Sequence, residues 1–167
     1  MTREEYSGDE AAVRAVHEAA FGRDAEARLV DRLRTDGLIV ASVVCVTEEK
    51  IVASAVFSDL AVITPAGSIK AVALAPVAVT PMYQHRGFGS SVIVHGLDLC
   101  AELGYEAVFV LGDPAYYSRF GFSSEIATAV SGPYSSAGTA WMAMKLHASS
   151  VALQGAAHYP DAFSIVD

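Results

Sequence analysis

The segment with the clearest capacity for chemistry is QHRGFGSS, residues 84–91, which follows the apolar run AVALAPVAV, residues 71–79. Gly87 and Gly89 let a ligand approach the backbone closely, and Arg86 adds a positive charge. A helix is expected to begin here, and the free N–H groups of a helix N-terminus attract anions. We therefore expect the segment to bind a phosphate or pyrophosphate group.

Two common nucleotide-binding motifs do not fit these glycines. The dinucleotide motif G-x-G-x-x-G needs a third glycine at the position that Val92 occupies. A P-loop needs Lys followed by Ser or Thr after its last glycine, whereas Ser90 and Ser91 follow here. The loop thus indicates an anion site of another kind.

The histidines and cysteines do not indicate a metal site. No two of the five histidines have helical ligand spacing with a carboxylate, so we predict no metal. His17 and His95 fall in amphipathic helices, where we expect surface or boundary positions, and the side chain of His85 should face solvent. Cys45 and Cys100 lack ligand spacing and are expected to be buried free thiols.

Composition narrows the class of protein. At 167 residues the chain is predicted to form one domain with its own core. Its net charge of −8 argues against nucleic-acid binding and would tolerate a cationic substrate. The longest apolar run, 71–79, is far shorter than the roughly 20 residues that span a bilayer. Because the start, MTREEYSGDE, is acidic where a signal peptide is basic, we expect a cytoplasmic protein without a membrane partner.

The elements that would position the loop follow from apolar periodicity. Two helices are predicted first, near residues 13–21 and over residues 24–36. The runs LIVASVVCVT and IVASAVFSDLAV, joined by the short polar turn 48–50, predict an antiparallel hairpin. A third strand over residues 68–79 should carry a bulge or an interrupted edge at Pro76, which cannot donate to a sheet.

The next elements form a strand–helix–strand unit. A helix over residues 90–103 separates the strand 71–79 from a buried strand over residues 107–111. Such crossovers join parallel strands, so both carboxyl ends lie at one edge of the sheet, where ligands of open α/β sheets bind. This places QHRGFGSS at the same edge as GDPAYYSRF, residues 112–120. A final strand is predicted over residues 140–146.

The chain resembles a known family of enzymes at these two segments. Gln84-x-x-Gly87-x-Gly89 matches the Q/R-x-x-G-x-G/A signature of the GNAT superfamily of acetyl-CoA-dependent N-acetyltransferases. VAV, residues 77–79, precedes it at the spacing that such enzymes show, and YSRFGF, residues 117–122, resembles their Tyr-x-x-x-Gly-Phe segment. The resemblance extends over nearly the whole chain and looks closest to the bacterial YhbS-like acetyltransferases.

The resemblance implies an α/β (α+β) fold of the GNAT type. Its sheet would be mixed and mostly antiparallel, with helices on both faces and a splayed parallel strand pair at the cofactor site. Residues 1–167 would form a single acetyltransferase domain.

The resemblance also implies a site for acetyl-CoA. Backbone groups of Val77 and Val79 would pair with the pantetheine arm, and the Val79 amide would polarise the thioester carbonyl. The amides of residues 84–90 would hold the pyrophosphate, with Arg86 adding charge. The predicted cofactor-binding residues are Val77, Ala78, Val79, Gln84, His85, Arg86, Gly87, Phe88, Gly89 and Ser90.

Tyr117 is implied as the general acid that protonates the departing CoA thiolate. A phenol with a pKa of about 10 can donate a hydrogen bond to a thiolate with a pKa of about 8.5 without first ionising. Tyr116 lies next to it in a short helix and must face another direction, so we expect it to pack or to line the cleft.

The general base is not indicated by any motif. Many relatives carry a glutamate on the strand before the phosphate loop, but residues 68–79 contain no carboxylate. An ordered water relay is one alternative. Asp59, Asp113 and Glu125 are the nearest candidates by topology.

These inferences predict direct transfer of an acetyl group from acetyl-CoA to a primary amine on a small molecule or a peptide. A CoA-binding sensor or regulatory module is the alternative, which the missing glutamate favours and the retained Tyr117 opposes. Another acyl-CoA or a hydroxyl acceptor also stays open, because Ala73, Ala75 and Ala78 would leave room for a longer acyl chain. The identity of the acceptor and the choice between monomer and homodimer are left open.

Overall fold

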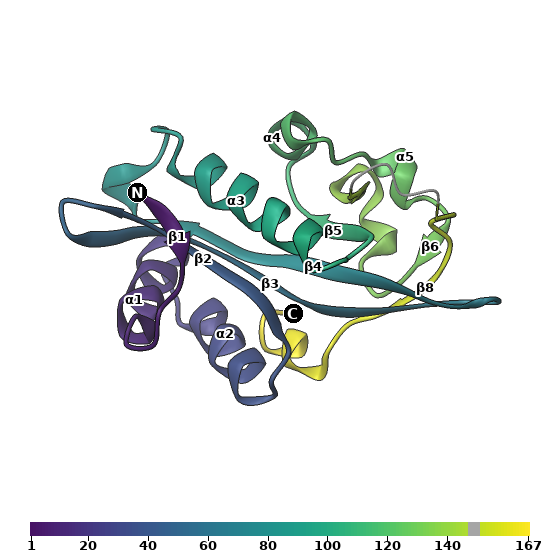
Figure 1. Cartoon of the computed structure of the whole chain (residues 1–167), viewed down its shortest axis with the longest axis horizontal. Coiled ribbons are helices and arrows are strands. Elements are labelled where there is room, and N and C mark those ends of the chain that lie inside the picture. The colour runs from purple at the N-terminus through teal and green to yellow at the C-terminus, as the bar shows by residue number, and fades with distance from the viewer. Residues whose placement is uncertain (147–150) are drawn as a thin grey trace. The chain divides into compact units, whose positions relative to one another are not determined.

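The computed structural model describes residues 1–146 and 151–167, and its elements are labelled in Figure 1. The chain divides into two compact units. The first unit comprises residues 1–58, 75–99 and 161–167, and the second comprises residues 59–74 and 100–160. Strands β3 (Lys50–Thr64) and β4 (Gly67–Val79) and helix α3 (Phe88–Glu102) contribute residues to both units.

The first unit is built on the antiparallel strands β1 (Thr2–Glu4), β2 (Ile39–Thr47) and β3. A turn at Glu48 and Glu49, with positive φ angles of 51° and 63°, joins β2 to β3. Two left-handed residues are what a two-residue hairpin loop of type I′ requires, and the predicted hairpin is confirmed. β1 was not predicted, because its residues TRE carry no apolar pattern.

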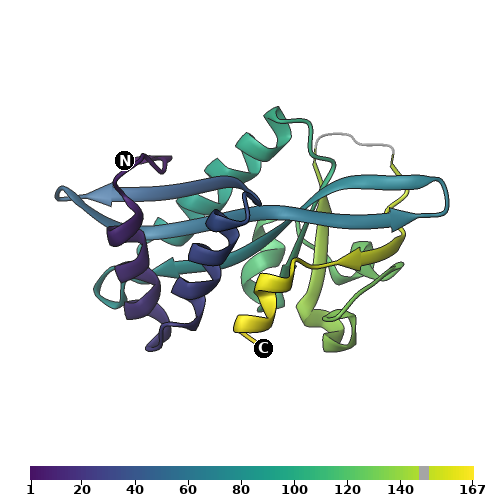
Figure 2. The ribbon, with the colours of Figure 1, turned by 90° about the horizontal axis from the view of Figure 1, so that it is seen from below.

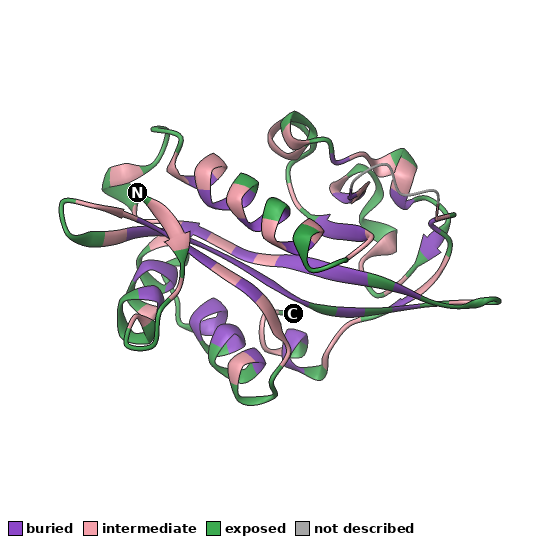
Figure 3. Cartoon of the chain, in the orientation of Figure 1, coloured by how far each residue is buried: buried purple, intermediate pink, exposed green. Residues whose placement is uncertain are grey.

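Helices cover both faces of these strands. Helices α1 (Glu10–Phe21) and α2 (Ala25–Thr35) lie on one face and α3 lies on the other (Figures 1 and 2). β3 is consequently buried on both sides, over the seven consecutive residues 52–58 (Figure 3). The 3-10 helix η4 (Asp161–Ile165) packs against α2, whose Leu29 and Leu33 belong to the core.

Helix α3 approaches β3 closely at Gly96. A Cβ atom built at this glycine would lie 2.5 Å from Cζ of Phe57, which is far inside van der Waals contact. Phe57 is fully buried beneath the helix. The absence of a side chain at Gly96 therefore determines how closely α3 packs on the sheet.

The second unit contains the distal part of β3, the beginning of β4 and four further strands. The further strands are β5 (Ala107–Leu111), β6 (Val130–Ser131), β7 (Trp141–Lys145) and β8 (Gly155–His158). β4 and β5 pair in parallel, from Ala71 opposite Ala107 to Ala73 opposite Phe109. β5 pairs with β7, and β3 with β8, in antiparallel fashion. The helical segments are α4 (Pro114–Tyr117), η2 (Ser118–Phe120), α5 (Ser124–Ala127) and η3 (Ser135–Ala140).

The predicted fold class is confirmed: the sheet is mixed and mostly antiparallel, and its parallel pairs are β4 with β5 and β6 with β8. The predicted helix over residues 90–103 is α3, which begins two residues earlier. The strand predicted over residues 140–146 is confirmed as β7. It is not the final strand, because β8 follows it, and the residues of β8, GAAH, contain no β-branched side chain that would indicate a strand. A single domain over residues 1–167 stays a prediction.

No helix within residues 1–146 and 151–167 is long and apolar enough to cross a membrane. The cytoplasmic location stays a prediction.

Candidate functional site

The candidate anion site lies in the first unit, where the chain leaves β4 and enters α3. After Val79 come the 3-10 helix η1 (Pro81–Tyr83) and the loop 84–87. Within this loop His85 and Gly87 have left-handed backbones, with φ angles of 63° and 86°. Such residues turn neighbouring N–H groups toward one side of the chain and create a concave anion site. A Cβ atom built on Gly87 would meet no atom within 4 Å, so the space beside this glycine is open.

The backbone amides of the loop are available to a ligand. At its two ends, the Gln84 N–H donates to the Pro81 carbonyl at 3.3 Å and the Ser91 N–H donates to the Gly87 carbonyl at 3.0 Å. Between them, the amides of residues 85–90 have no acceptor among the described residues. A row of free N–H groups at the start of a 15-residue helix can bind an anion, and the predicted pyrophosphate site stays a prediction.

Side chains of the loop and of η1 connect the loop to neighbouring parts of the chain. The Gln84 side chain donates from Nε2 to the Val79 carbonyl at 3.0 Å, which ties the loop to the end of β4. The guanidinium of Arg86 lies 5.6 Å from the centre of the Tyr83 ring, and the Tyr83 hydroxyl donates to Glu48 at 3.3 Å. His85 and Arg86 are exposed, as expected for His85.

The end of β4, residues 77–79, precedes η1 and this loop in the chain. Val77 and Val79 are half-buried, whereas Ala78 between them is buried. The parallel ladder with β5 comprises only residues 71–73 of β4, although the strand itself continues to Val79. This agrees with the edge interruption that Pro76 predicts.

Tyr117 lies in the second unit, at the end of α4. The Asp113 side chain caps this helix by accepting a hydrogen bond from the Ala115 N–H at 3.0 Å. The Tyr117 ring stands perpendicular to the rings of Tyr116 and Phe122, with centroid distances of 5.0 and 5.8 Å. Burial among these groups, together with the neighbouring Tyr116, raises the pKa of Tyr117 to about 12. The phenol therefore keeps its proton at neutral pH.

The predicted site residues thus fall in different units. The cofactor-binding candidates, residues 77–79 and 84–90, all belong to the first unit, and Tyr117 belongs to the second. Of the candidate bases, Asp113 is engaged as the cap of α4, and Asp59 accepts a hydrogen bond from the Tyr105 hydroxyl at 3.4 Å. Glu125 lies exposed in the first turn of α5.

His17 departs from its predicted surface or boundary position. It is fully buried, and its Nε2 lies 3.2 Å from the Ser54 hydroxyl, while Nδ1 has no partner among the described residues. Burial lowers the pKa of His17 to about 4. The sequence pattern missed this because a histidine counts as polar on a helix whose buried face it shares with Val13 and Val16. In the described part of the chain, no three His, Cys, Asp or Glu side chains gather as metal ligands would.

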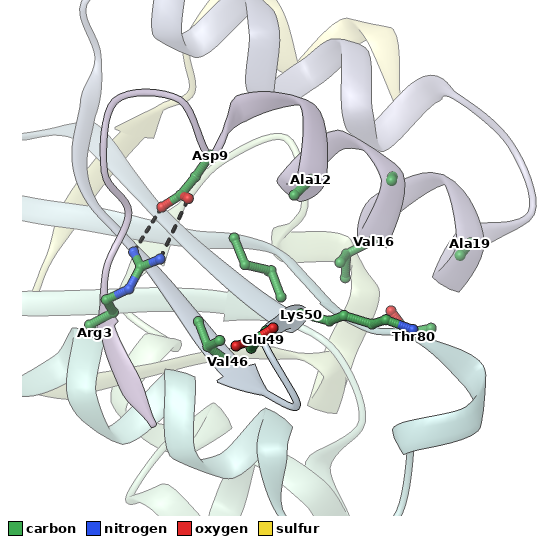
Figure 4. A pocket seen from close by; sticks show the side chains of 11 residues that line it. Arg3, Asp9, Ala12, Val16, Ala19, Val46, Glu49, Lys50 and Thr80 are labelled. Carbon is green, nitrogen blue, oxygen red and sulfur yellow. Dashed lines mark hydrogen bonds and ion pairs between the residues drawn. The ribbon is translucent and has the colours of Figure 1, made fainter.

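An open groove of about 570 Å³ lies in the first unit, between α1 and the hairpin of β2 and β3 (Figure 4). Small side chains of α1, including Ala12 and Ala19, form one wall, and the ion pair of Arg3 with Asp9 closes one end. None of the predicted cofactor-binding residues lines the groove, and Thr80 is the lining residue that directly follows β4.

Comparison with protein families matches residues 2–124 to the family described as the acetyltransferase (GNAT) domain. A protein of Escherichia coli (strain K12) named uncharacterized N-acetyltransferase YhbS is 37% identical over 123 residues, which are 73% of this chain and 72% of that protein. Another from the same strain, named uncharacterized N-acetyltransferase YjhQ, is 35% identical over 116 residues, which are 68% of this chain and 64% of that protein.

Two solved structures resemble the fold closely. The crystal structure of YhbS from Escherichia coli in complex with CoA matches with a TM-score of 0.89 and 30% identity, over 98% of this chain and 91% of that chain. A GNAT family acetyltransferase from Brucella melitensis in complex with acetyl-CoA matches with a TM-score of 0.80 and 27% identity, over 98% of this chain and 97% of that chain.

Proposed function

Because this chain belongs to the GNAT family of acetyl-CoA-dependent N-acetyltransferases, we propose that it moves the acetyl group of acetyl-CoA directly to a primary amine. The observation that carries the proposal is the row of free amides at residues 85–90, which overlaps the motif Gln84-x-x-Gly87-x-Gly89. The complexes of the two relatives with CoA and acetyl-CoA support the same choice of co-substrate.

The free amides of residues 85–90 are proposed to hold the pyrophosphate, and the Arg86 side chain adds a positive charge from the exposed side of the loop. The N–H and the side chain of Gln84 already donate to the Pro81 and Val79 carbonyls, so Gln84 is proposed to contribute by holding the loop. The backbone of residues 77–79 is proposed to pair with the pantetheine arm, and the Val79 N–H to polarise the carbonyl that the amine attacks. Acetyl-CoA supplies the activated thioester when it is bound.

Tyr117 is proposed to hold the proton that the departing thiolate receives. Its raised pKa keeps the hydroxyl protonated at neutral pH, so that the donor is ready in every molecule. The amine must lose a proton as well. Since β4 contains no carboxylate, we propose that an ordered water relays this proton to a base or to bulk solvent. Asp59, Asp113 and Glu125 stay the candidate bases.

Calorimetric titration with acetyl-CoA tests the cofactor site first. We expect micromolar binding that desulfo-CoA and pyrophosphate-containing fragments compete, because the amides bind phosphate rather than sulfur. Arg86→Gln should bind more weakly, whereas Met82→Ala, an exposed residue of η1, should bind like the wild type. Absence of binding at millimolar acetyl-CoA would overturn the proposal.

A panel of primary amines then separates an enzyme from a sensor. Release of the CoA thiol with at least one small-molecule or peptide amine is the expected result. Tight binding of acetyl-CoA without release for any amine would favour the regulatory module, which the missing strand carboxylate allows. Parallel reactions with propionyl-CoA, succinyl-CoA and hydroxyl acceptors would identify another acyl group or acceptor.

A further inference from the structure

Gly112 occupies a fixed position between β5 and α4. It follows Leu111, the last residue of β5, and its N–H donates to the Ala140 carbonyl at 3.0 Å. Directly after it, Asp113 caps α4 with its side chain and accepts a hydrogen bond from the Tyr117 N–H at its carbonyl, also at 3.0 Å. The backbone on both sides of Gly112 is therefore held by hydrogen bonds.

The Tyr117 ring occupies the space that a side chain at position 112 would need. A Cβ atom built on this glycine would lie 2.8 Å from Cδ2 of Tyr117 and would contact Cε2 more closely still. Carbon atoms that are not bonded pack at about 3.5–4.0 Å. Any side chain at position 112 would therefore displace the ring, by roughly 1 Å or more.

The backbone itself does not demand a glycine at this position. Gly121, a few residues on, has a left-handed φ of 103°, whereas Gly112 is not among the glycines with positive φ. A substitution at Gly112 is thus a steric change without backbone strain. Gly121 belongs to the Tyr-x-x-x-Gly-Phe segment, whereas Gly112 lies outside it.

The ring has little freedom on its other sides. Phe122, which is buried, and Tyr116 both meet it edge to face. Phe120 contributes a third aromatic contact, with a centroid distance of 6.3 Å. Pushing the ring away from Gly112 must disturb these contacts, and the hydroxyl at the end of the ring moves with it.

We infer that Gly112 is a positioning residue for acetyl transfer: its missing side chain provides the space that places the Tyr117 hydroxyl. The inference rests on the proposed role of Tyr117 as the proton donor. Gly112 acts through Tyr117, so its effect on the reaction exists only while that hydroxyl is present. A displacement of this size in a catalytic group lowers turnover by as much as about 100-fold.

A double-mutant cycle tests this dependence. Gly112→Ala should lower kcat at least about 10-fold and leave the Kd for acetyl-CoA within about twofold. Tyr117→Phe should lower kcat by about 100-fold. The double variant should equal Tyr117→Phe, because the added methyl group then has no hydroxyl to misplace. Gly132→Ala is the control, since its methyl group would meet only Ala157 in the same unit, at 3.3 Å.

A measurement independent of activity follows the ring directly. In protein labelled on its tyrosine rings, the Tyr117 resonance is the one that Tyr117→Phe removes, and it should shift in Gly112→Ala but not in Gly132→Ala. Wild-type kcat in Gly112→Ala beside an impaired Tyr117→Phe would overturn the positioning role alone. Additive losses in the double variant would also overturn it. Wild-type kcat in Tyr117→Phe would overturn the role of Tyr117 and this inference with it.

Discussion

At the scale of single residues, the burial of His17 makes the stability of the fold depend on pH. Burial lowers the folded-state pKa to about 4, against an opposing contribution from Glu26. The unfolded chain binds this proton at about pH 6.5, so between these values the unfolded state holds more protons. The free energy of unfolding is therefore unaffected by His17 above about pH 6.5 and decreases as the pH falls toward 4. At pH 5 we expect a loss of roughly 2 kcal/mol in the free energy of unfolding, measured by urea denaturation.

Two variants separate His17 from the other histidines. His17→Asn should flatten the dependence between pH 7.5 and pH 5, whatever its own stability at pH 7.5. His95→Asn, at a half-buried position on α3, should keep the wild-type slope. The attribution to His17 would be wrong if both variants lost stability over this pH range as the wild type does.

The side chain of Gln84 stabilises a loop whose backbone amides form the proposed binding site. Its hydrogen bond to the Val79 carbonyl holds the loop in the shape that presents the free amides. Removing one such bond costs about 1 kcal/mol, so Gln84→Ala should weaken acetyl-CoA binding about 5-fold in calorimetry. Met82→Ala removes an exposed side chain of η1 and should have no effect. Equal affinity in all three proteins would show that the loop does not need this tether.

At the scale of elements, the close contact of α3 with β3 ties the phosphate loop to the core. Gly96→Ala would force a methyl group against the Phe57 ring, and overpacking of this kind costs about 1–3 kcal/mol. We expect a lower urea midpoint with an unchanged slope. Val94→Ala, at an exposed position of the same helix, is the matched control. A wild-type midpoint in Gly96→Ala would mean that Phe57 moves aside freely.

Some of these elements could be predicted from the sequence and others could not. The hairpin of β2 and β3, the parallel pair of β4 and β5 and the helix after the glycines follow from apolar periodicity and local turn signals. β1 and β8 were not predicted because they are short and their residues, TRE and GAAH, show no alternating apolar pattern. The contact of Gly112 with Tyr117 was not predicted, because Gly112 does not have the positive φ of a turn glycine and nothing in the sequence around it indicates the contact. A tertiary contact of this kind is visible only in three dimensions.

At the scale of the whole molecule, the net charge of −8 should favour cationic acceptors over neutral ones. Salt shortens the Debye length from about 30 Å at 0.01 M to about 3 Å at 1 M, which removes this attraction. With acetyl-CoA saturating, kcat/KM for 1,4-diaminobutane should fall several-fold between 20 and 500 mM salt. For 4-aminobutanoate, which is neutral overall, it should change less than about twofold. Equal responses of the two amines would mean that charges close to the acceptor, rather than the field of the whole chain, govern its encounter with the enzyme.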